Sequence, residues 1–503
     1  MSTASQENEI VLVGVGQCVQ RDASPGHARD PVQLMAEAAG RAAEDSGIGP
    51  RVFDHVGLVA TVDAFAWTPA NPARLVADAV GAKPSRLVAS TVGGNTPQAY
   101  VNWLAGEIRA GRAGTSLVAG VNVVASMMKA RAAGVRLAWP TGGGEAAERF
   151  GDDRTGGTDY EQAHGLFLPA NTYPLFENAL RARRGLSIAE HNLAIGRMFS
   201  RFTEVAAKNP YSWFPTARSA EELVTPSESN RWVSFPYTKY LNSVMAVDQA
   251  AAVLVTSAAE AARLGIPRER WVWFCGGGSA SEDPWNVTER PSLDRCPAMS
   301  FAAGQAMARA GVTAGDLSFF DLYSCFPVAV ELACEGLGIS ETDPRGLTVT
   351  GGLPYFGGPG NNYTLHGIAS MAERLREKEG AFGLVTGNGW YLTKHSAGVY
   401  SSAPPSRAAL PEPAPGSARH REPAVRVAHE PEGDATVETY TVVCGRSGEP
   451  ETGIVVGRLA GGDRFLAHTP DDPALLREWM AHEGVGRRGR VRASSPCNVF
   501  TPE

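Results

Sequence analysis

Three side chains in the second half of the chain could attack a carbonyl or move a proton. Cys325 offers a thiol, and His366 and His395 offer imidazoles. These are the groups that enzymes most often use as nucleophiles and as general acids or bases. Each also has a structural interpretation, because a buried Cys is usually an inert apolar residue and a His within a regular element is often simply packed. The sequence leaves both roles open for all three residues.

A glycine-rich stretch in the first half could bind an oxyanion. Gly93-Gly94-Asn95-Thr96-Pro97 follows the apolar run 86–90 and precedes a helical pattern over 98–108. This order predicts a strand, a tight turn and a helix, with Thr96 as the N-cap and Pro97 in the first turn. Free N–H groups at such a helix start can bind a thioester oxygen or another anion. A tight connection without a ligand explains the two glycines equally well.

A second group of polar residues follows Gly358 in the sequence. Asn361 and Asn362 carry side-chain amides that could hydrogen-bond a carbonyl. His366 lies eight positions after Gly358, about two helical turns away, so its imidazole cannot stand in the place of Gly358. His395 could form a polar cluster with Lys394 and Tyr391, although a strand directs only alternate residues to one face.

The order and spacing of these stretches resemble the four motif blocks of the thiolase superfamily. The helix-opening block C-x-S-G matches Gly93 to Thr96, and the block H-D-C-F of sterol-carrier-type thiolases matches Tyr323 to Phe326. The blocks G-G-x-x-x-x-G-H-P and C-x-G match Gly351 to Pro359 and Val385 to Gly387. The chain most resembles thiolase-like protein type 1, a sterol-carrier-type thiolase relative with an additional C-terminal domain.

The reactive residue of each block is replaced in this chain. Gly93 stands where a thiolase has its nucleophilic Cys, and Gly358 where it has its His. Val385 replaces the acid–base Cys, and Tyr323 replaces the His of the second block. A thiolase reaction requires a thiolate and a second base. We therefore predict that thiolysis is absent and that Gly93, Gly358 and Val385 are degenerate positions.

The resemblance implies that coenzyme A or an acyl-CoA thioester is the ligand, with no covalently bound cofactor and no metal. The ligand-binding residues that it implies are Gly94, Asn95, Thr96, Phe326, Gly357, Pro359, Asn361 and Asn362. Tyr323 is the candidate proton donor. One alternative is retro-aldol cleavage of an acyl-CoA in lipid or sterol breakdown, with Tyr323, Tyr355, Tyr363 or His366 as acid and base. Another is a protein scaffold with a vestigial pocket. A partner enzyme of lipid metabolism is compatible with each of them.

Strand-like runs alternate with helical stretches, a pattern typical of an α/β protein with mixed sheets. The resemblance implies the five-layered thiolase fold of two similar βαβ halves. We predict an N-terminal half over 1–125 and 243–269, a loop or lid domain over 126–242, and a C-terminal half over 270–402. A Pro-rich linker over 403–426 leads to an additional domain over 427–503. The strand pattern of this last domain predicts a small β-barrel of the OB type.

Composition excludes several classes of protein. The 503 residues are 43% hydrophobic and 20% charged, as in an ordinary globular protein, and the net charge of -7 argues against nonspecific nucleic-acid binding. The seven Cys form no C-x-x-C pair, a pattern typical of reduced thiols. No apolar run approaches the roughly 20 residues of a membrane span, and the first residues lack a basic signal region. We expect a cytoplasmic monomer or dimer.

Overall fold

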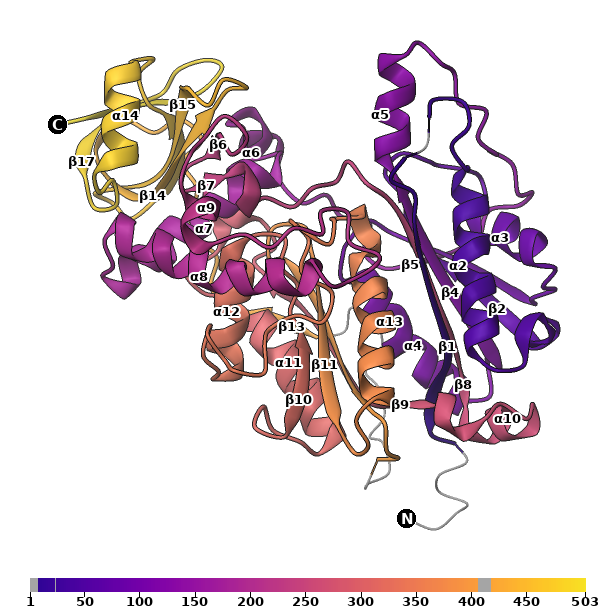
Figure 1. Cartoon of the computed structure of the whole chain (residues 1–503). Helices are drawn as coiled ribbons and strands as arrows, with labels where there is room; N and C mark the ends of the chain where they lie inside the picture. Colours follow the sequence, from indigo (N-terminus) through magenta and orange to yellow (C-terminus); the bar gives the residue numbers. More distant parts are fainter. Residues whose placement is uncertain (1–7, 23, 406–417) are drawn as a thin grey trace.

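The computed structural model describes residues 8–22, 24–405 and 418–503 (Figure 1). Its α-helices are α2 (Pro31–Asp45), α3 (Pro72–Val80), α4 (Thr96–Arg109), α5 (Val124–Ala132), α6 (Asp159–Ala163), α7 (Pro169–Arg184), α8 (Ile188–Ala206), α9 (Ala220–Val224), α10 (Ala258–Arg263), α11 (Pro297–Ala310), α12 (Pro327–Leu337), α13 (Tyr363–Arg376) and α14 (Pro473–Ala481). No helix within these ranges is long and apolar enough to cross a membrane.

Most strands join one large mixed sheet in the order β10-β11-β12-β9-β1-β8-β4-β2-β3-β5, with β13 added beside β9. These strands are β1 (Ile10–Val19), β2 (Val56–Thr61), β3 (Arg86–Ser90), β4 (Thr115–Val123), β5 (Glu148–Phe150), β8 (Asp248–Ser257), β9 (Val272–Asp283), β10 (Leu317–Asp321), β11 (Phe382–Gly389), β12 (Lys394–Ser401) and β13 (Arg419–Arg421). In the described part of the chain, the strands of the first and second halves meet where β1 pairs with β9 over three residues.

Helices cover both outer faces of this sheet and fill the space between its two halves. Helices α4 and α13 contact strands of both halves, namely β1 and β8 on one side and β9, β11 and β12 on the other (Figure 1). Helices α2 and α3 cover the outer face of the first half, and α11 covers that of the second with α12 packed on it. The predicted arrangement of five layers is thus confirmed. Because α4 is covered on two sides, even its polar residues Gln98 and Asn102 are buried and bonded to each other.

The C-terminal region forms a closed five-stranded barrel, shown in yellow in Figure 1. Its strands are β14 (Gly433–Cys444), β15 (Pro450–Leu459), β16 (Arg464–His468), β17 (Arg488–Arg492) and β18 (Val499–Pro502). The ring runs β14-β15-β16-β18-β17 and closes where β17 pairs again with β14. Trp479 of α14 is fully buried in the barrel core. The predicted barrel is confirmed.

The segment between β4 and β8 ties the barrel to the rest of the chain. Two short strands within it, β6 (Trp232–Ser234) and β7 (Tyr237–Thr238), extend the barrel sheet beside β14. Helix α7 packs on β14 as well. Residues 406–417 of the predicted linker lie outside the described residues. Within the predicted linker, the backbone of Arg419–Arg421 pairs with β9 and forms β13.

Candidate functional site

The turn that precedes α4 is closed by hydrogen bonds to neighbouring residues. The N-cap of α4 is Asn95, one residue before the predicted Thr96. The N–H of Gly93 donates to Oδ1 of Asn361 at 2.9 Å, so it is not free to bind a thioester oxygen. Gly93 has a φ of 153°, which an L side chain rarely adopts. The backbone of this turn is therefore built for glycine.

Tyr323 fills the space beside the turn. A β-carbon on Gly94 would stand 2.1 Å from the Tyr323 hydroxyl and 2.6 Å from the carbonyl oxygen of Asn388. The Tyr323 N–H donates to Oγ1 of Thr386, which fixes its backbone. Burial raises the pKa of Tyr323 well above its ordinary value, so the phenol stays protonated. A void of about 10 Å³, room for a single water, lies beside it.

The Gly357-Gly358-Pro359 turn is closed in the same manner. A β-carbon on Gly358 would lie 2.1 Å from Oγ of Ser243, and the Gly358 N–H donates to the Val244 carbonyl at 2.9 Å. A β-carbon on Gly357 would lie 2.5 Å from Oε1 of Gln249. The segment that leads into β8 thus occupies the room in which a thiolase His would lie.

Val385 is not at the site. It lies within β11, fully buried in the apolar core formed around α4 and α13. Gly387 and Gly389, further along the same strand, approach the turn: a β-carbon on Gly387 would lie 2.9 Å from the Cα of Asn95, and one on Gly389 would lie 2.4 Å from its Oδ1. Val385 is thus enclosed in the core, whereas the two glycines that follow it on the strand border the turn.

Cys325 and Phe326 are packed among other side chains. Burial raises the pKa of Cys325 to about 12, which keeps the thiol protonated and unreactive. Phe326 stacks on Tyr173 of α7 with ring centroids 4.4 Å apart. Nδ2 of Asn388 donates to the Tyr173 hydroxyl at 2.9 Å. This group joins the segment between β4 and β8 to the second half of the fold and presents no free nucleophile.

The two Asn residues and His366 serve the packing of α13. Nδ2 of Asn361 donates to the carbonyl of Asp63 at 3.0 Å, while its Oδ1 accepts the Gly93 N–H described above. Asn362 lies against Gly120. His366 is fully buried with Nδ1 2.8 Å from Oε1 of Gln17, and burial lowers its pKa to about 3. We therefore assign His366 to packing.

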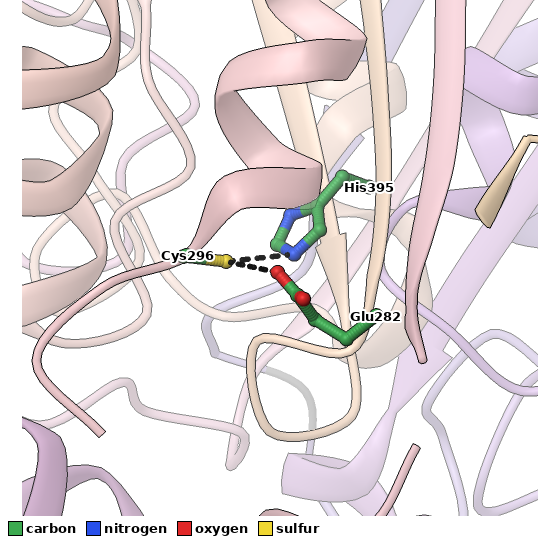
Figure 2. A group of neighbouring side chains, drawn as sticks. All are labelled: Glu282, Cys296 and His395. Atoms are coloured by element: carbon green, nitrogen blue, oxygen red, sulfur yellow. Dashed lines mark hydrogen bonds between the residues drawn. The ribbon is translucent and has the colours of Figure 1, made fainter. Parts of the chain in front are cut away.

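His395 belongs to a buried cluster with Cys296 and Glu282 (Figure 2). Its Nε2 lies 3.2 Å from the Cys296 sulfur, which in turn lies 3.4 Å from Oε1 of Glu282. Burial lowers the pKa of His395 to about 3 and raises those of Cys296 and Glu282. The guanidinium of Arg290 opposes the rise at Glu282. Their donor atoms lie close enough together to hold a metal ion. Without a metal the charges already balance, because His395 and the Cys296 thiol are neutral and the Glu282 carboxylate is offset by Arg290.

The predicted cluster of His395 with Lys394 and Tyr391 does not form. Tyr391 donates its hydroxyl to the Phe167 carbonyl. Lys394 and His395 are neighbours on β12 and point to opposite faces, because side chains alternate along a strand. His395 meets Cys296, the N-cap of α11, whereas Nζ of Lys394 reaches the turn before α4 and donates to the Val92 carbonyl.

The face of α4 next to this turn borders a cavity of about 560 Å³. Its walls come from the start of α4, the end of β9, the segment after β5 and the start of β12. The lining residues are Thr91, Asn95, Thr96, Ala99, Asn102, Trp103, Arg149, Phe150, Gly151, Asp152, Asp153, Ser279, Ala280, Ser281, Trp285, Lys394 and His395. Of the residues predicted to bind a ligand, only Asn95 and Thr96 line it. The volume is in the usual range for small-molecule sites.

Comparison with known proteins identifies the fold. A model described as the thiolase-like protein type 1 additional C-terminal domain matches residues 417–495. The crystal structure of a monomeric SCP2-thiolase like protein type 1 from Mycobacterium smegmatis is 35% identical, with a TM-score of 0.83, over 98% of this chain and 99% of that one. The chain belongs to the SCP2-thiolase-like protein type 1 family.

Two more distant structures share the fold of this SCP2-thiolase-like protein. One is an Ltp2-ChsH2(DUF35) aldolase, 20% identical with a TM-score of 0.58 over 79% of this chain and 98% of that one. The other is the dimeric peroxisomal thiolase of Saccharomyces cerevisiae, 15% identical with a TM-score of 0.55 over 78% and 98%. At these identities the likeness concerns the fold alone. No curated protein matches the chain by sequence.

Lys394 is the residue of this SCP2-thiolase-like protein that sequence reasoning underrated. It is 6% exposed, it lines the cavity, and burial lowers its pKa to about 8. The sequence showed it only as a neighbour of His395. The alternation of side chains along β12 could have identified Lys394, because it places Lys394 and His395 on opposite faces of the strand.

Proposed function

We propose that this SCP2-thiolase-like protein binds an acyl thioester of coenzyme A in the 560 Å³ cavity and does not carry out thiolysis. One observation carries the proposal. A cavity of ligand size borders the N-terminus of α4, the helix that opens on the first thiolase block, while the reactive residue of that block is a glycine. The cavity walls contain no Cys, and the imidazole of their one His is directed to Cys296.

The chemistry of the walls supports a ligand of mixed character. Trp103, Phe150 and Trp285 provide apolar surface for an acyl or pantetheine chain. Asn95 and Ser281 offer hydrogen-bonding groups for amides or for the thioester oxygen.

Filling the cavity tests the proposal. Titration calorimetry with coenzyme A, acetyl-CoA and acetoacetyl-CoA should detect binding to the parent protein. Ala99→Phe places a ring inside the cavity and should weaken binding by about tenfold or more, which corresponds to about 1.4 kcal/mol. Ala110→Phe is the matched control, because Ala110 caps the other end of the same helix and is exposed. It should bind like the parent.

Product analysis in the same samples separates the alternatives. Incubation with acetoacetyl-CoA and coenzyme A should give no acetyl-CoA. Formation of acetyl-CoA that is lost in Ala99→Phe would overturn the absence of thiolysis. Binding of no ester would overturn the proposal and favour a scaffold with a vestigial pocket.

Cleavage of a carbon–carbon bond is the second candidate. Lys394 favours it, because a primary amine with a pKa of about 8 can act as a base or as a nucleophile near neutral pH. The residues predicted for this reaction, Tyr323, Tyr355, Tyr363 and His366, do not line the cavity. Release of an aldehyde or ketone from a β-hydroxyacyl-CoA would support this candidate.

We also propose that the chain acts as a monomer. The edge of β3 is covered by β5, so one exposed edge of the large sheet is reduced to a strand of three residues. The similar protein from Mycobacterium smegmatis is described as monomeric. Light scattering should give the mass of one chain, 53.1 kDa, and twice that mass would reject the proposal.

A further inference from the structure

We infer that Lys394 is a nucleophile that forms an imine with an aldehyde or ketone group of the ligand in the cavity. The inference rests on the proposed function and deepens it. It names the reacting group, and it restricts the ligand to a compound with a free oxo group, such as a 3-oxoacyl thioester.

The first support is the position of the amine. A β-carbon on Gly93 would lie 3.0 Å from Nζ of Lys394 and 2.4 Å from Oδ1 of Asn95. Gly93 is the residue that stands in place of the thiolase nucleophile. Nζ of Lys394, on β12, thus lies next to the space that a cysteine side chain at position 93 would occupy. The fold retains a nucleophilic atom at this point although the thiol is absent.

The second support is the bonding state of the amine. Nζ donates to the Val92 carbonyl and, among the described residues, forms no ion pair with a carboxylate. Burial lowers its pKa to about 8, an effect that Asp152 and Asp153 oppose and Arg154 reinforces. An ordinary Lys has a pKa near 10.4. A much larger share of this amine is therefore unprotonated at neutral pH, which a nucleophile requires.

The third support is the strained turn that carries Lys394. Trp390 and Leu392 have φ values of 57° and 53°, in the left-handed region that non-glycine residues rarely occupy. The turn is held by the buried Arg290, which donates to the carbonyls of Tyr391 and Leu392, and by the Tyr173 hydroxyl. Such strain costs stability and gathers at functional sites. Here it fixes the start of β12, and with it the direction of Lys394.

The proposed chemistry balances without a further reactant. The unprotonated Nζ attacks the carbonyl carbon, a C–N bond forms, and the carbonyl oxygen takes up a proton. Loss of water then breaks the C–O bond and leaves the imine. The amine and the oxo compound thus give an imine and water, with no change of oxidation state. Attack on the thioester carbonyl would instead form an amide and release coenzyme A.

Reductive trapping tests the inference. The parent protein is incubated with acetoacetyl-CoA and sodium cyanoborohydride, digested, and analysed by mass spectrometry. The expected product is a secondary amine on Lys394 that retains the coenzyme A moiety. Lys394→Met and Lys394→Arg should abolish it. Lys378→Met is the control, because Lys378 is exposed and does not line the cavity, and it should leave the adduct unchanged.

Two further measurements make every outcome decisive. If titration shows binding but no adduct forms on Lys394, or if an acyl amide forms there instead, the inference fails while the proposed function stands. If acetyl-CoA binds and acetoacetyl-CoA does not, the inference fails while the proposed function stands. If no ester binds, the proposed function fails, and reductive methylation with formaldehyde tests the amine alone. At pH 7.5 Lys394 should react about tenfold or more faster than Lys378, with half-maximal reaction near pH 8. Equal or slower reaction of Lys394 would overturn the inference.

Discussion

The N-terminus of α4 separates a closed region from an open one, although both belong to the same layer of the fold. On the closed side, side chains and carbonyls fill the space next to Gly94, Gly358 and Gly357 to within 2.6 Å of where a β-carbon would be. On the open side, a cavity of about 560 Å³ remains, and Lys394 reaches into the turn between the two regions. The thiolase positions are closed by packing, and the room for a ligand lies beside them.

The difference shows why the glycines of the motif blocks persist without the reactive residues. Gly94 is needed because Tyr323 and the Asn388 carbonyl lie where a side chain would project. Gly358 is needed because the Ser243 hydroxyl lies where a side chain at position 358 would project. In both cases glycine is explained by close packing rather than by an oxyanion site. The retention of a glycine pattern is therefore weak evidence for the chemistry that the pattern serves elsewhere.

The largest expected effect comes from adding one methyl group on the closed side. Gly94→Ala should lower the free energy of unfolding by about 3 kcal/mol or more, because the Asn388 carbonyl cannot move away without distorting β11. Gly106→Ala, within the helix α4 that follows Gly94, is the control, since its β-carbon meets nothing within 4 Å. It should stabilise the protein by up to about 1 kcal/mol.

Urea unfolding followed by circular dichroism measures both variants. Equal stability of Gly94→Ala and the parent would mean that the closed side can expand, and the comparison between the two regions would no longer hold.

Much of the fold could be predicted from sequence, because the strands, the helices and the barrel follow from local periodicity and from the order of the blocks. The site was harder to predict. The packing of Val385 in the core could not be predicted, because the motif spacing does not show which side of β11 faces the turn. Arg419–Arg421 was assigned to a linker because only the tertiary structure shows that β9 offers it a partner. His395 was preferred over Lys394 because its side chain titrates near neutral pH in water, whereas burial reverses that order in the folded protein.

The second prediction concerns the cost of the buried amine. The folded protein lowers the Lys394 pKa from 10.5 to about 8, so charging this amine destabilises the fold below pH 8. Between pH 8 and 10.5 the unfolded chain binds a proton that the folded chain has released, so the stability of the parent rises with pH in that window. Lys394→Met removes the titration. Near pH 7 it should be more stable than the parent by about 2 kcal/mol, after allowing for its lost hydrogen bond.

Denaturation midpoints at several pH values test the direction in which stability changes with pH. The advantage of Lys394→Met should shrink from pH 8 upward and vanish above pH 10.5. Lys378→Arg, a change at an exposed site, should show no such trend. A Lys394→Met variant that is less stable than the parent at pH 7 would mean that the charged amine is well solvated or paired, and the share of unprotonated amine on the open side would be smaller than inferred above.

The smallest expected effect comes from the thiol on the closed side. Cys325→Ala should lower stability by about 1 kcal/mol, because the buried sulfur is lost, and should leave ligand affinity and the Lys394 adduct within about twofold of the parent. In the parent, iodoacetamide at pH 7.5 should label the partly exposed Cys497 before the buried Cys325, whose pKa is about 12. If instead Cys325 were labelled first, and a ligand protected it, the thiol would face the bound molecule. The closed and open regions would then be one site, and Cys325 would return as its nucleophile.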